Sequence, residues 1–389
     1  MILKEVMHHF GDKNVLLLQG PVGPFFYKLS KILKENNAKV FKINFTGGDF
    51  LFYPFNAISY KDSLENLRNF IYEFCLKNNI QIVFAFNDCR PIHKESIKAL
   101  KQLGIDYYIF EEGYIRPNFI TFEKDGVNAN SKLPKEKSFY LQYKPTPYEK
   151  KEYPKSYFGS MAWISFYYWA MSFILGFYFN NALHHRSLSP MEMFPWFLSL
   201  YRKYYYKLKE RSCIKKIKES KKRYFALILQ VYNDTQIKNH FDGKRIERFI
   251  KRSIISFARY SNPKDILVIK HHPMDRGYKD YHHIINRIAI KCQIKDRILY
   301  IHDIHLPTFL SNATGCVVIN STTGLSSILH NCPTKVCGNA IYDIDGLTYQ
   351  GSLDLFWKKA RKISINKKLY KNFRGYLIDK IQIEGNFYS

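Results

Sequence analysis

The chain has 389 residues, of which 46% are hydrophobic, and its formal net charge is +27. This length suits two domains of ordinary size, and the apolar content excludes a largely disordered chain. The charge points to anionic partners without choosing among nucleic acid, an anionic lipid surface and an anionic small substrate. The seven cysteines are scattered with no CxxC pair, which disfavours a disulfide framework or a zinc ribbon and fits a reducing cytosol.

The first 150 residues alternate short apolar runs with helical patterns. We expect strands at 15–18, 39–45, 80–86 and 106–113, and helices at 25–37, 62–78 and 93–103. Strands that alternate with helices predict a parallel sheet covered on both faces.

The last third of the chain repeats this rhythm. We expect strands at 224–232, 265–273, 297–303 and 315–320, and helices at 244–260, 281–291 and 306–313. Residues 353–379 are mostly helical in pattern. A second parallel sheet is therefore predicted.

A different segment lies between these two sections. Residues 156–183 contain no Asp, Glu, Lys or Arg, and a basic, aromatic-rich run follows them. Three interpretations are open: a transmembrane helix, a helical hairpin buried in the protein, and a helix at a membrane interface. We favour the interfacial helix, because aromatic rings suit the headgroup level and the basic run suits anionic phosphates.

The first motif is the turn after the first expected strand. Gln19, Gly20 and Gly23 lie where a strand passes into a helix. Glycines there allow backbone N–H groups to approach an anion, although a tight turn without a ligand would look the same.

The second motif follows the strand at 80–86. Asp88, Arg90 and His93 cluster just past its end, where parallel sheets bind ligands. Arg90 can hold a carboxylate or phosphate, and Asp88 is a candidate nucleophile or base. An ordinary helix-capping role for Asp88 is the alternative.

The third motif is acidic. Glu111 and Glu112 follow a strand, and Arg116 is close enough in sequence to be a counter-ion. Adjacent carboxylates raise each other's pKa, which suits proton transfer, although two solvated surface glutamates remain an alternative.

The fourth motif ends the strand at 265–273 with Lys270, His271, His272 and Pro273. Ammonium and imidazole groups can neutralise a phosphate leaving group without a metal. Consecutive strand residues point to opposite faces, which disfavours a zinc site, and a structural role remains open for His271.

The fifth motif follows the strand at 315–320. Ser321, Thr322 and Thr323 stand at the start of an expected helix. Hydroxyls and unpaired N–H groups there form a phosphate cradle, although plain helix capping is common.

Taken together, an acidic [D/E][D/E]G motif followed by HP and a Ser/Thr pair resembles bacterial sialyltransferases and Kdo transferases of the GT-B type, with two Rossmann-like domains. Over nearly the whole chain, the sequence resembles the KpsS/LipB family of capsule polysaccharide proteins. The segments that carry this resemblance are LQGPVGPFF, KINFTGGDFLFYP, NDCRPIH, FEEGYIRPNFIT, KHHPMDRG, INSTTGLSS and AIYDIDGLTYQG.

The resemblance implies an α/β, GT-B-like fold in four parts. These are an acceptor-side Rossmann-like domain at 1–150, an aromatic and basic membrane-associating helical segment at 151–222, a Rossmann-like nucleotide-sugar domain at 223–352, and C-terminal helices at 353–389.

The resemblance also implies an activity: transfer of the first β-linked Kdo from CMP-Kdo onto lyso-phosphatidylglycerol, which starts the capsule's lipid anchor. The protein would be peripheral at the cytoplasmic face of the bacterial inner membrane, use neither metal nor cofactor, and work with a KpsC-type transferase and the capsule assembly complex. Glu111, Glu112 and Gly113 match the acidic motif, His272 and Pro273 match HP, and Ser321 and Thr322 match the Ser/Thr pair.

One departure concerns stereochemistry. The sialyltransferases with this pattern invert configuration, whereas making β-Kdo from CMP-β-Kdo retains it. A base role for the acidic motif therefore does not transfer, and Asp88 competes as the nucleophile.

Two other classes of function compete with the enzyme. A non-catalytic scaffold of capsule assembly or export would carry the same fold without needing the carboxylates. A nucleic-acid binder is suggested by charge alone, and because the sequence contains no recognised nucleic-acid module we expect no nucleic-acid partner.

Overall fold

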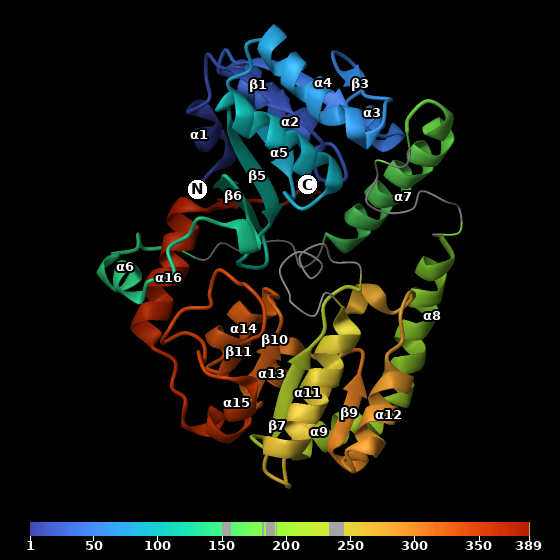
Figure 1. Ribbon diagram of the computed structural model, residues 1–389, viewed down its shortest axis with the longest axis vertical. Helices are drawn as coiled ribbons and strands as arrows, with labels where there is room; N and C mark the ends of the chain where they lie inside the picture. Colours follow the sequence, from blue (N-terminus) through green and yellow to red (C-terminus); the bar gives the residue numbers. More distant parts are fainter. Residues whose placement is uncertain (150–156, 181–182, 184–190, 192, 233–244, 389) are drawn as a thin grey trace. The chain divides into compact units, whose positions relative to one another are not determined.

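The computed structural model describes residues 1–149, 157–180, 183, 191, 193–232 and 245–388. The chain forms two compact units (Figure 1). Unit 1 comprises Met1–Lys132, Pro145–Pro190 and Gly375–Ser389, and unit 2 comprises Leu133–Lys144 and Met191–Arg374. The segment expected at 151–222 is thus divided between the units. The expected C-terminal helices are divided as well, because residues up to Arg374 belong to unit 2 and Gly375–Ser389 belongs to unit 1.

Unit 1 is built on a seven-stranded sheet in the order β12-β6-β5-β4-β1-β2-β3. Its strands are β1 (Asn14–Leu17), β2 (Lys39–Asn44), β3 (Ile58–Ser59), β4 (Ile82–Phe86), β5 (Asp106–Glu112), β6 (Phe119–Lys124) and β12 (Gln382–Glu384). Strands β1 to β5 are parallel, and β6 and β12 extend the sheet in antiparallel fashion. The strand order reverses between β1 and β4, which is where Rossmann-like sheets bind ligands.

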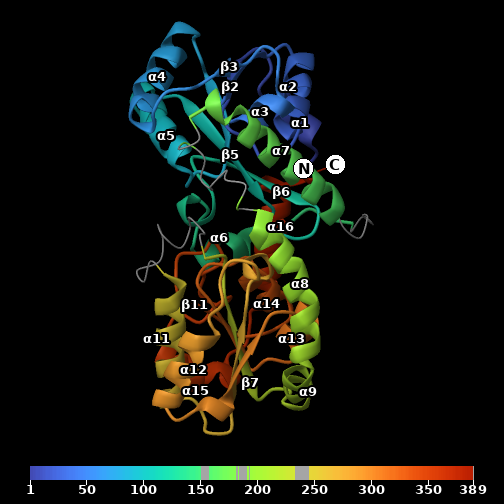
Figure 2. The ribbon, with the colours of Figure 1, turned by 90° about the vertical axis from the view of Figure 1, so that its right-hand side faces the viewer.

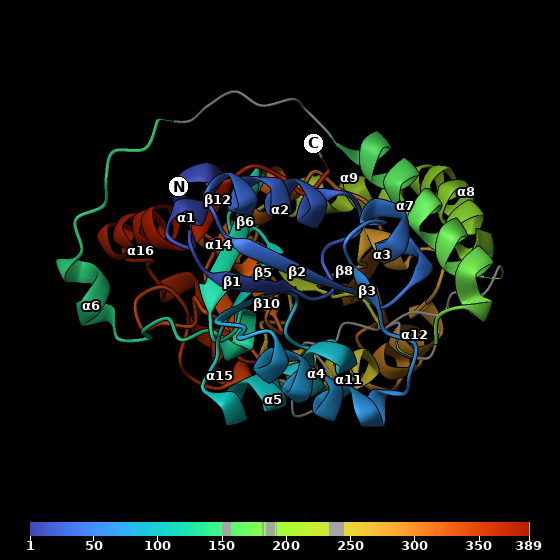
Figure 3. The same ribbon diagram turned by 90° about the horizontal axis from the view of Figure 1, so that it is seen from above.

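Helices cover both faces of this sheet (Figure 3). They are α1 (Leu3–His8), α2 (Phe25–Glu35), α3 (Gly47–Phe52), α4 (Leu64–Lys77) and α5 (Pro91–Leu103), and α7 (Phe158–Ile174) packs against α3. Alternate residues of β1 enter different cores: Leu16 packs with α4 and α5, whereas Val15 and Leu17 pack with α1 and α2. The period of two is the reason why the central strands read as continuous apolar runs.

Unit 2 contains a five-stranded parallel sheet in the order β11-β10-β7-β8-β9. Its strands are β7 (Tyr224–Ile228), β8 (Ile266–Lys270), β9 (Ile298–Ile301), β10 (Gly315–Val318) and β11 (Thr334–Val336). Here the order reverses between β7 and β10, so this sheet repeats the arrangement of unit 1. The prediction of two Rossmann-like domains is confirmed.

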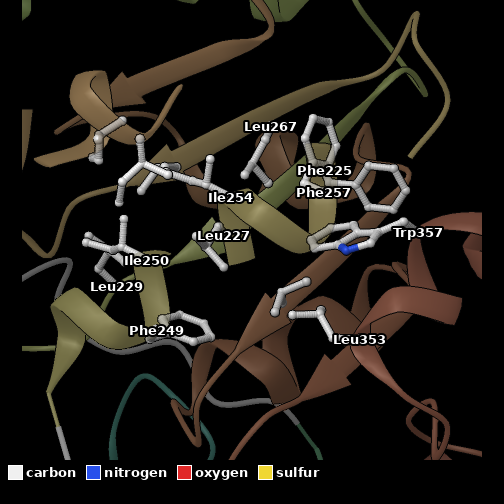
Figure 4. Close-up of a cluster of buried hydrophobic side chains, with 14 of the residues drawn as sticks. Phe225, Leu227, Leu229, Phe249, Ile250, Ile254, Phe257, Leu267, Leu353 and Trp357 are labelled. Carbon is white, nitrogen blue, oxygen red and sulfur yellow. The ribbon is translucent and has the colours of Figure 1, made fainter. Parts of the chain in front are cut away.

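Helices also cover both faces of the unit 2 sheet (Figure 2). They are α8 (Met193–Lys209), α9 (Arg211–Glu219), α11 (Ile246–Tyr260), α12 (His282–Lys291), α13 (Leu306–Ser311), α14 (Thr323–Leu329) and α15 (Leu353–Lys359). α6 (Lys137–Gln142) packs against α16 (Lys367–Lys380) through Tyr140 and Phe373, and α16 continues from unit 2 into unit 1. The core under α11 is aromatic: Phe225, Phe257 and Trp357 meet edge to face (Figure 4).

Four strands were not predicted from the sequence: β3, β6, β11 and β12. Three of them have only two or three residues, too few to show a period of two. β12 pairs with β6 across more than 250 residues of sequence, as in Ile383 opposite Ile120. The C-terminal residues expected to be helical therefore end in an edge strand.

Helix α7 lies within the apolar segment and has two faces. Trp163 and Tyr167 are 64% and 54% exposed, whereas Tyr168 and Ser172 are buried. Because α7 packs against α3 through one face only, it does not form the buried hairpin considered above. Within the described residues, no helix combines the length and apolarity needed to span a membrane.

Candidate functional site

The acidic motif lies at the carboxyl end of β5. Glu111 Oε2 accepts a hydrogen bond from Asn87 Nδ2 at 2.9 Å, and Glu111 Oε1 accepts one from the Glu112 N–H at 3.0 Å. Burial raises the pKa of Glu111 to about 7, and the charges of Glu112 and Asp88 act in the same direction. Glu111 can therefore gain or lose a proton near neutral pH.

Glu112 lies at the same strand end but faces a different set of groups. Arg116 Nη1 is 3.9 Å from Glu112 Oε2, and the Tyr388 hydroxyl donates to Glu112 Oε1 at 3.5 Å. The side chains of Arg116 and Glu112 are 58% and 38% exposed, so this ion pair is open to solvent. The expected counter-ion role of Arg116 is thus present as a loose surface contact.

Asp88 holds the loop that follows β6. Its Oδ2 accepts hydrogen bonds from the Val127 N–H at 3.0 Å and from Asn130 Nδ2 at 2.9 Å. Asp88 is only 4% exposed. These contacts give Asp88 a structural task, which favours Glu111 and Glu112 over Asp88 as groups that meet a substrate.

Gln19 and Arg90 join the ends of β1 and β4 at the switch point of unit 1. Arg90 Nη1 donates to Gln19 Oε1 at 2.7 Å and to the Gly20 carbonyl at 3.3 Å. Gln19 Nε2 donates in turn to Asp49 Oδ2 at 3.0 Å. Since all three side chains are buried, protein groups already fill this position.

The network continues into α7. The Tyr168 hydroxyl donates to Asp49 Oδ1 at 2.9 Å and lies 2.8 Å from Thr46 Oγ1. A Cβ on Gly48 would lie 2.5 Å from the Tyr168 ring, so only glycine allows this approach. The TGGD segment carries part of the family resemblance, but its contact with α7 was not predicted; the paired glycines beside an aspartate were the available signal.

Of the other anion-binding candidates of unit 1, His93 and Gly20 are buried and Gly23 is partly exposed. His93 Nδ1 donates to the Asn87 carbonyl at 2.7 Å, and burial lowers the pKa of His93 to about 3. A Cβ on Gly20 would meet the Phe26 ring at 2.8 Å, and one on Gly23 would meet Ile164 at 2.9 Å. His93 is therefore neutral at physiological pH, and both glycines serve close packing.

Glu123 is a buried carboxyl group that the sequence did not single out. It accepts a hydrogen bond from the Tyr114 hydroxyl at 2.7 Å and another from Ser131. Burial raises the pKa of Glu123 to about 7. It lies on β6 opposite Ile109, and the unpredicted strand is the reason it was missed.

In unit 2, the Ser/Thr motif follows β10 at the switch point. Ser321 Oγ accepts a hydrogen bond from the Thr323 N–H at 3.2 Å. Ser321, Thr322 and Thr323 are each partly exposed, so their hydroxyls are accessible. Beside them, Gln230 Nε2 donates to Asn320 Oδ1 at 2.9 Å, which links the ends of β7 and β10.

The HHP motif follows β8 at the same edge. His272 Nδ1 accepts a hydrogen bond from the Met274 N–H at 3.2 Å, so the proton of the neutral ring is on Nε2. His271 is fully buried beside the Tyr300 hydroxyl, and burial lowers the pKa of His271 to about 3. Burial also lowers the pKa of Lys270. His272 and Pro273, which are partly exposed, are the accessible part of the motif.

The buried His302 follows β9 at the same edge of the unit 2 sheet. Glu210 accepts hydrogen bonds from the His302 N–H at 2.9 Å and from His302 Nδ1 at 2.5 Å. The Tyr206 ring stacks on the imidazole with ring centroids 3.5 Å apart. The sequence did not predict a role for His302, because its partners Glu210 and Tyr206 lie more than 90 residues away along the chain.

Each unit thus gathers its predicted residues at the carboxyl edge of its own sheet. Unit 1 brings together Gln19, Arg90, His93, Asp88 and the acidic motif, and unit 2 brings together the HHP and Ser/Thr motifs. Among the described residues, no three His, Cys, Asp or Glu side chains are arranged as metal ligands. The functional groups accessible to a substrate are therefore the titratable carboxylate of Glu111 in unit 1 and the hydroxyl and imidazole groups of the Ser/Thr and HHP motifs in unit 2.

Comparison with known proteins gives consistent matches. A family model described as "Capsule polysaccharide biosynthesis protein" matches residues 81–388. The chain is 39% identical over 383 residues to the Escherichia coli "Capsule polysaccharide export protein KpsS", with 97% of each chain covered. It is 37% identical over 387 residues to the "Capsule polysaccharide modification protein LipB" of Neisseria meningitidis serogroup B, covering 97% of this chain and 92% of the relative.

Solved structures give weaker likeness. A "beta Kdo 2,7 transferase" structure, Thermosulfurimonas dismutans KpsC, is 16% identical with a TM-score of 0.43 and 96% of each chain covered. A glycosyltransferase from Rickettsia africae is 11% identical with a TM-score of 0.36, covering 95% of this chain and 99% of the other.

Proposed function

Because this chain belongs to the capsule polysaccharide biosynthesis family, we propose that it is a glycosyltransferase of capsule assembly. The reaction we propose is transfer of Kdo from CMP-Kdo to lyso-phosphatidylglycerol with retention of configuration. The product would begin the β-Kdo linker of the capsule's lipid anchor. A KpsC-type transferase would then extend it.

The observation that carries the proposal is Glu111. A carboxylate whose pKa is near 7, partly buried at a strand end and held by two N–H donors, suits a group that acts on a reacting sugar. In the transfer, the bond between the sugar's anomeric carbon and the phosphate oxygen breaks and its electron pair leaves with CMP. The acceptor hydroxyl forms the new bond and loses its proton. Retention excludes one direct back-side displacement at the anomeric carbon. Glu111 therefore either attacks that carbon and is then displaced by the acceptor oxygen, whose proton passes to the phosphate of CMP, or takes the acceptor proton while another nucleophile forms the intermediate. In either role Glu111 must be ionised.

Unit 2 supplies groups that suit the nucleotide. The accessible hydroxyls of Ser321 and Thr322 can donate hydrogen bonds to a phosphate. His272, with its Nε2 proton, can donate another as negative charge develops on the leaving phosphate. This leaving group is a monophosphate, so its charge can be met by protein donors alone, and we propose that no metal or cofactor is needed.

The charge and the exposed aromatic residues support the lipid acceptor. The donor's sugar carboxylate and phosphate and the acceptor's phosphate are all anionic, and the chain carries a net charge of +27. α7 also exposes the aromatic residues Phe158, Trp163 and Tyr167. Aromatic side chains of this kind favour the membrane–water interface. We propose that the enzyme is a peripheral protein at the cytoplasmic face of the inner membrane.

Mass spectrometry of lipid products tests the reaction. Purified protein incubated with CMP-Kdo and detergent-dispersed lyso-phosphatidylglycerol should yield a product that carries one Kdo. Glu111→Gln should lower the rate by about 100-fold or more, as expected for loss of a general base or nucleophile. Glu123→Gln is the matched control, because burial raises the pKa of Glu123 to about 7 as well; its rate should change by less than about tenfold.

A non-catalytic role in capsule export is the second candidate, and the name of the Escherichia coli relative favours it. In that case Glu111→Gln and His272→Ala would leave capsule formation intact in a complementation assay. The transferase proposal requires both variants to lose it while the protein remains at normal levels.

A further inference from the structure

Helix α8 in unit 2 carries an apolar stripe on its exposed side. Phe194, Phe197, Tyr201, Tyr204 and Leu208 follow one another at spacings of three and four residues, and each is between 60% and 68% exposed. At 3.6 residues per turn, this spacing keeps all five side chains on one side of the helix over about 20 Å. A stripe this long and this aromatic needs a partner.

Positive charge borders this stripe. α8 contains no acidic residue and four basic ones, among which Lys203, Lys207 and Lys209 are exposed. The helical period places Lys203 and Lys207 along one border of the stripe and Lys209 along the other. Aromatic side chains flanked by lysines match the boundary of an anionic bilayer, where rings enter the headgroup level and ammonium groups meet phosphates. A second copy of the chain would instead bring two cationic surfaces together.

The opposite side of α8 contacts the loop that follows the HHP motif. Arg202 Nη1 donates to the Arg276 carbonyl at 2.7 Å, in the loop that follows the HHP motif. Trp196 Nε1 donates to the Tyr278 hydroxyl at 3.1 Å. Tyr206 stacks on His302 at the end of the neighbouring strand β9. A Cβ on Gly277 would lie 1.9 Å from the Pro195 carbonyl oxygen, so this loop requires glycine where it meets the start of α8.

We propose that the exposed stripe of α8 is a docking surface for a bilayer that contains anionic phospholipid. The five stripe residues enter the headgroup region and the three lysines bind lipid phosphates. Through its inner face, α8 then fixes the HHP loop at the lipid surface. This inference deepens the membrane association of the proposed function and rests on it, because it names the surface by which unit 2 would reach a lipid acceptor.

Vesicle sedimentation with the full-length protein tests the surface. Vesicles of phosphatidylcholine alone are compared with vesicles in which about one third of the lipid is phosphatidylglycerol, at low and at raised salt. The triple variant Phe197→Ser, Tyr201→Ser, Leu208→Ser should bind the anionic vesicles at least about tenfold more weakly. The variant Lys203→Gln, Lys207→Gln, Lys209→Gln should lose the preference for phosphatidylglycerol and the salt dependence.

A matched control is available on unit 1. Phe55, Tyr72 and Leu76 are exposed residues of the same three types, and their triple Ser variant should bind vesicles like the wild type. Equal binding by the two Ser triples would overturn the proposal. So would a dimer that only the α8 triple dissociates, or RNA binding that only the α8 triple loses, since either would assign the stripe to another partner.

Measuring transfer with two forms of the acceptor distinguishes the docking surface from the proposed transferase activity. The α8 triple should keep transfer to detergent-dispersed acceptor within about twofold of wild type while losing transfer to acceptor in vesicles. Absent transfer by every variant, with the vesicle binding pattern intact, would refute the proposed reaction and leave the docking surface standing. Intact transfer with unchanged vesicle binding would refute the docking surface.

Discussion

Asn87 controls the environment of Glu111 through a fixed amide orientation. Its Oδ1 accepts the Cys89 N–H at 2.9 Å, so the other end of the amide, Nδ2, must face Glu111 as a donor. The backbone at Asn87 is left-handed, with φ of 64°, which asparagine tolerates better than most residues. Asn87 is therefore a positioning residue: its donor favours the ionised form of Glu111, against the effect of burial.

This geometry predicts the pH dependence of transfer. Because the pKa of Glu111 is about 7 and the ionised form is required, the rate should rise between pH 6 and pH 8. Asn87→Gly removes the amide donor while glycine accepts the left-handed backbone. Its loss makes ionisation harder, so the midpoint of the pH–rate profile should move to higher pH, with part of the activity recovered at alkaline pH.

The measurement is kcat against pH for wild type and Asn87→Gly. Asn128→Ala is the control, because Asn128 Nδ2 lies 3.4 Å from Glu111 Oε2 and is the weaker donor, so the shift should be smaller. A midpoint that stays in place or moves to lower pH in Asn87→Gly would show that Asn87 does not set this ionisation.

At this scale the sequence predicted which side chains gather but not what they do. Asp88 and Glu111 were both identified, because strand ends mark the ligand edge of a parallel sheet. Their tasks depend on partners that the sequence does not reveal: Asp88 holds Val127 and Asn130, whereas Glu111 meets Asn87. Glu123 was missed because it lies in β6, which was not predicted.

Helix α7 is docked on unit 1 by two glycines. A Cβ on Gly47 would lie 2.2 Å from the Met171 carbonyl oxygen, and one on Gly48 would lie 2.5 Å from the Tyr168 ring. The Gly48 N–H also donates to Ser172 Oγ at 2.9 Å. The exposed aromatic face of α7 is therefore held in a set orientation by a backbone contact that any larger residue would disrupt.

Gly48→Ala should displace α7 and destabilise unit 1. Overpacking of this kind typically costs about 1–3 kcal/mol, and the displaced Tyr168 would also leave Asp49 without one of its donors. Thermal unfolding should show a lower Tm. Gly159→Ala in the same helix is the control, since a Cβ there meets no atom within 4 Å, and its Tm should stay the same or rise. Equal loss of Tm in both variants would contradict the docking role of Gly48.

The long helices were predictable because each spans enough turns to show the helical period of its apolar residues. The helices at α4, α5 and α11 begin and end within about two residues of their expected bounds. The two-residue β3 and three-residue β12 were not predictable, because their pairing depends on neighbours distant in sequence. The sequence also did not predict which side of α7 and of α8 is buried, since aromatic residues occupy both the docked and the exposed side of each helix.

Both units contain a glutamine that links the ends of two neighbouring strands, but its surroundings differ between the units. In each, a glutamine two residues past the central strand reaches the neighbouring strand's loop: Gln19 binds Arg90, and Gln230 binds Asn320. In unit 1, Arg90 and Asp49 fill the switch point, so the accessible chemistry is displaced to Glu111 at the end of β5. In unit 2, partly exposed hydroxyls remain beside the glutamine. The fold repeat therefore predicts a division of labour, with the nucleotide bound in unit 2 and the carboxylate supplied by unit 1.

CMP binding tests this division. The double variant Ser321→Ala, Thr322→Ala should weaken CMP binding by about tenfold or more in calorimetry, because hydrogen bonds to a charged phosphate contribute roughly 1.5–3 kcal/mol each. Ser326→Ala, on the same helix α14, is the control and should bind CMP like wild type. Glu111→Gln should also keep CMP affinity within about twofold while losing turnover, because the carboxylate acts on the sugar and acceptor rather than on the nucleotide. If Glu111→Gln loses CMP affinity as severely as the hydroxyl variant, both motifs serve nucleotide binding, and the assignment of separate tasks to the two units is wrong.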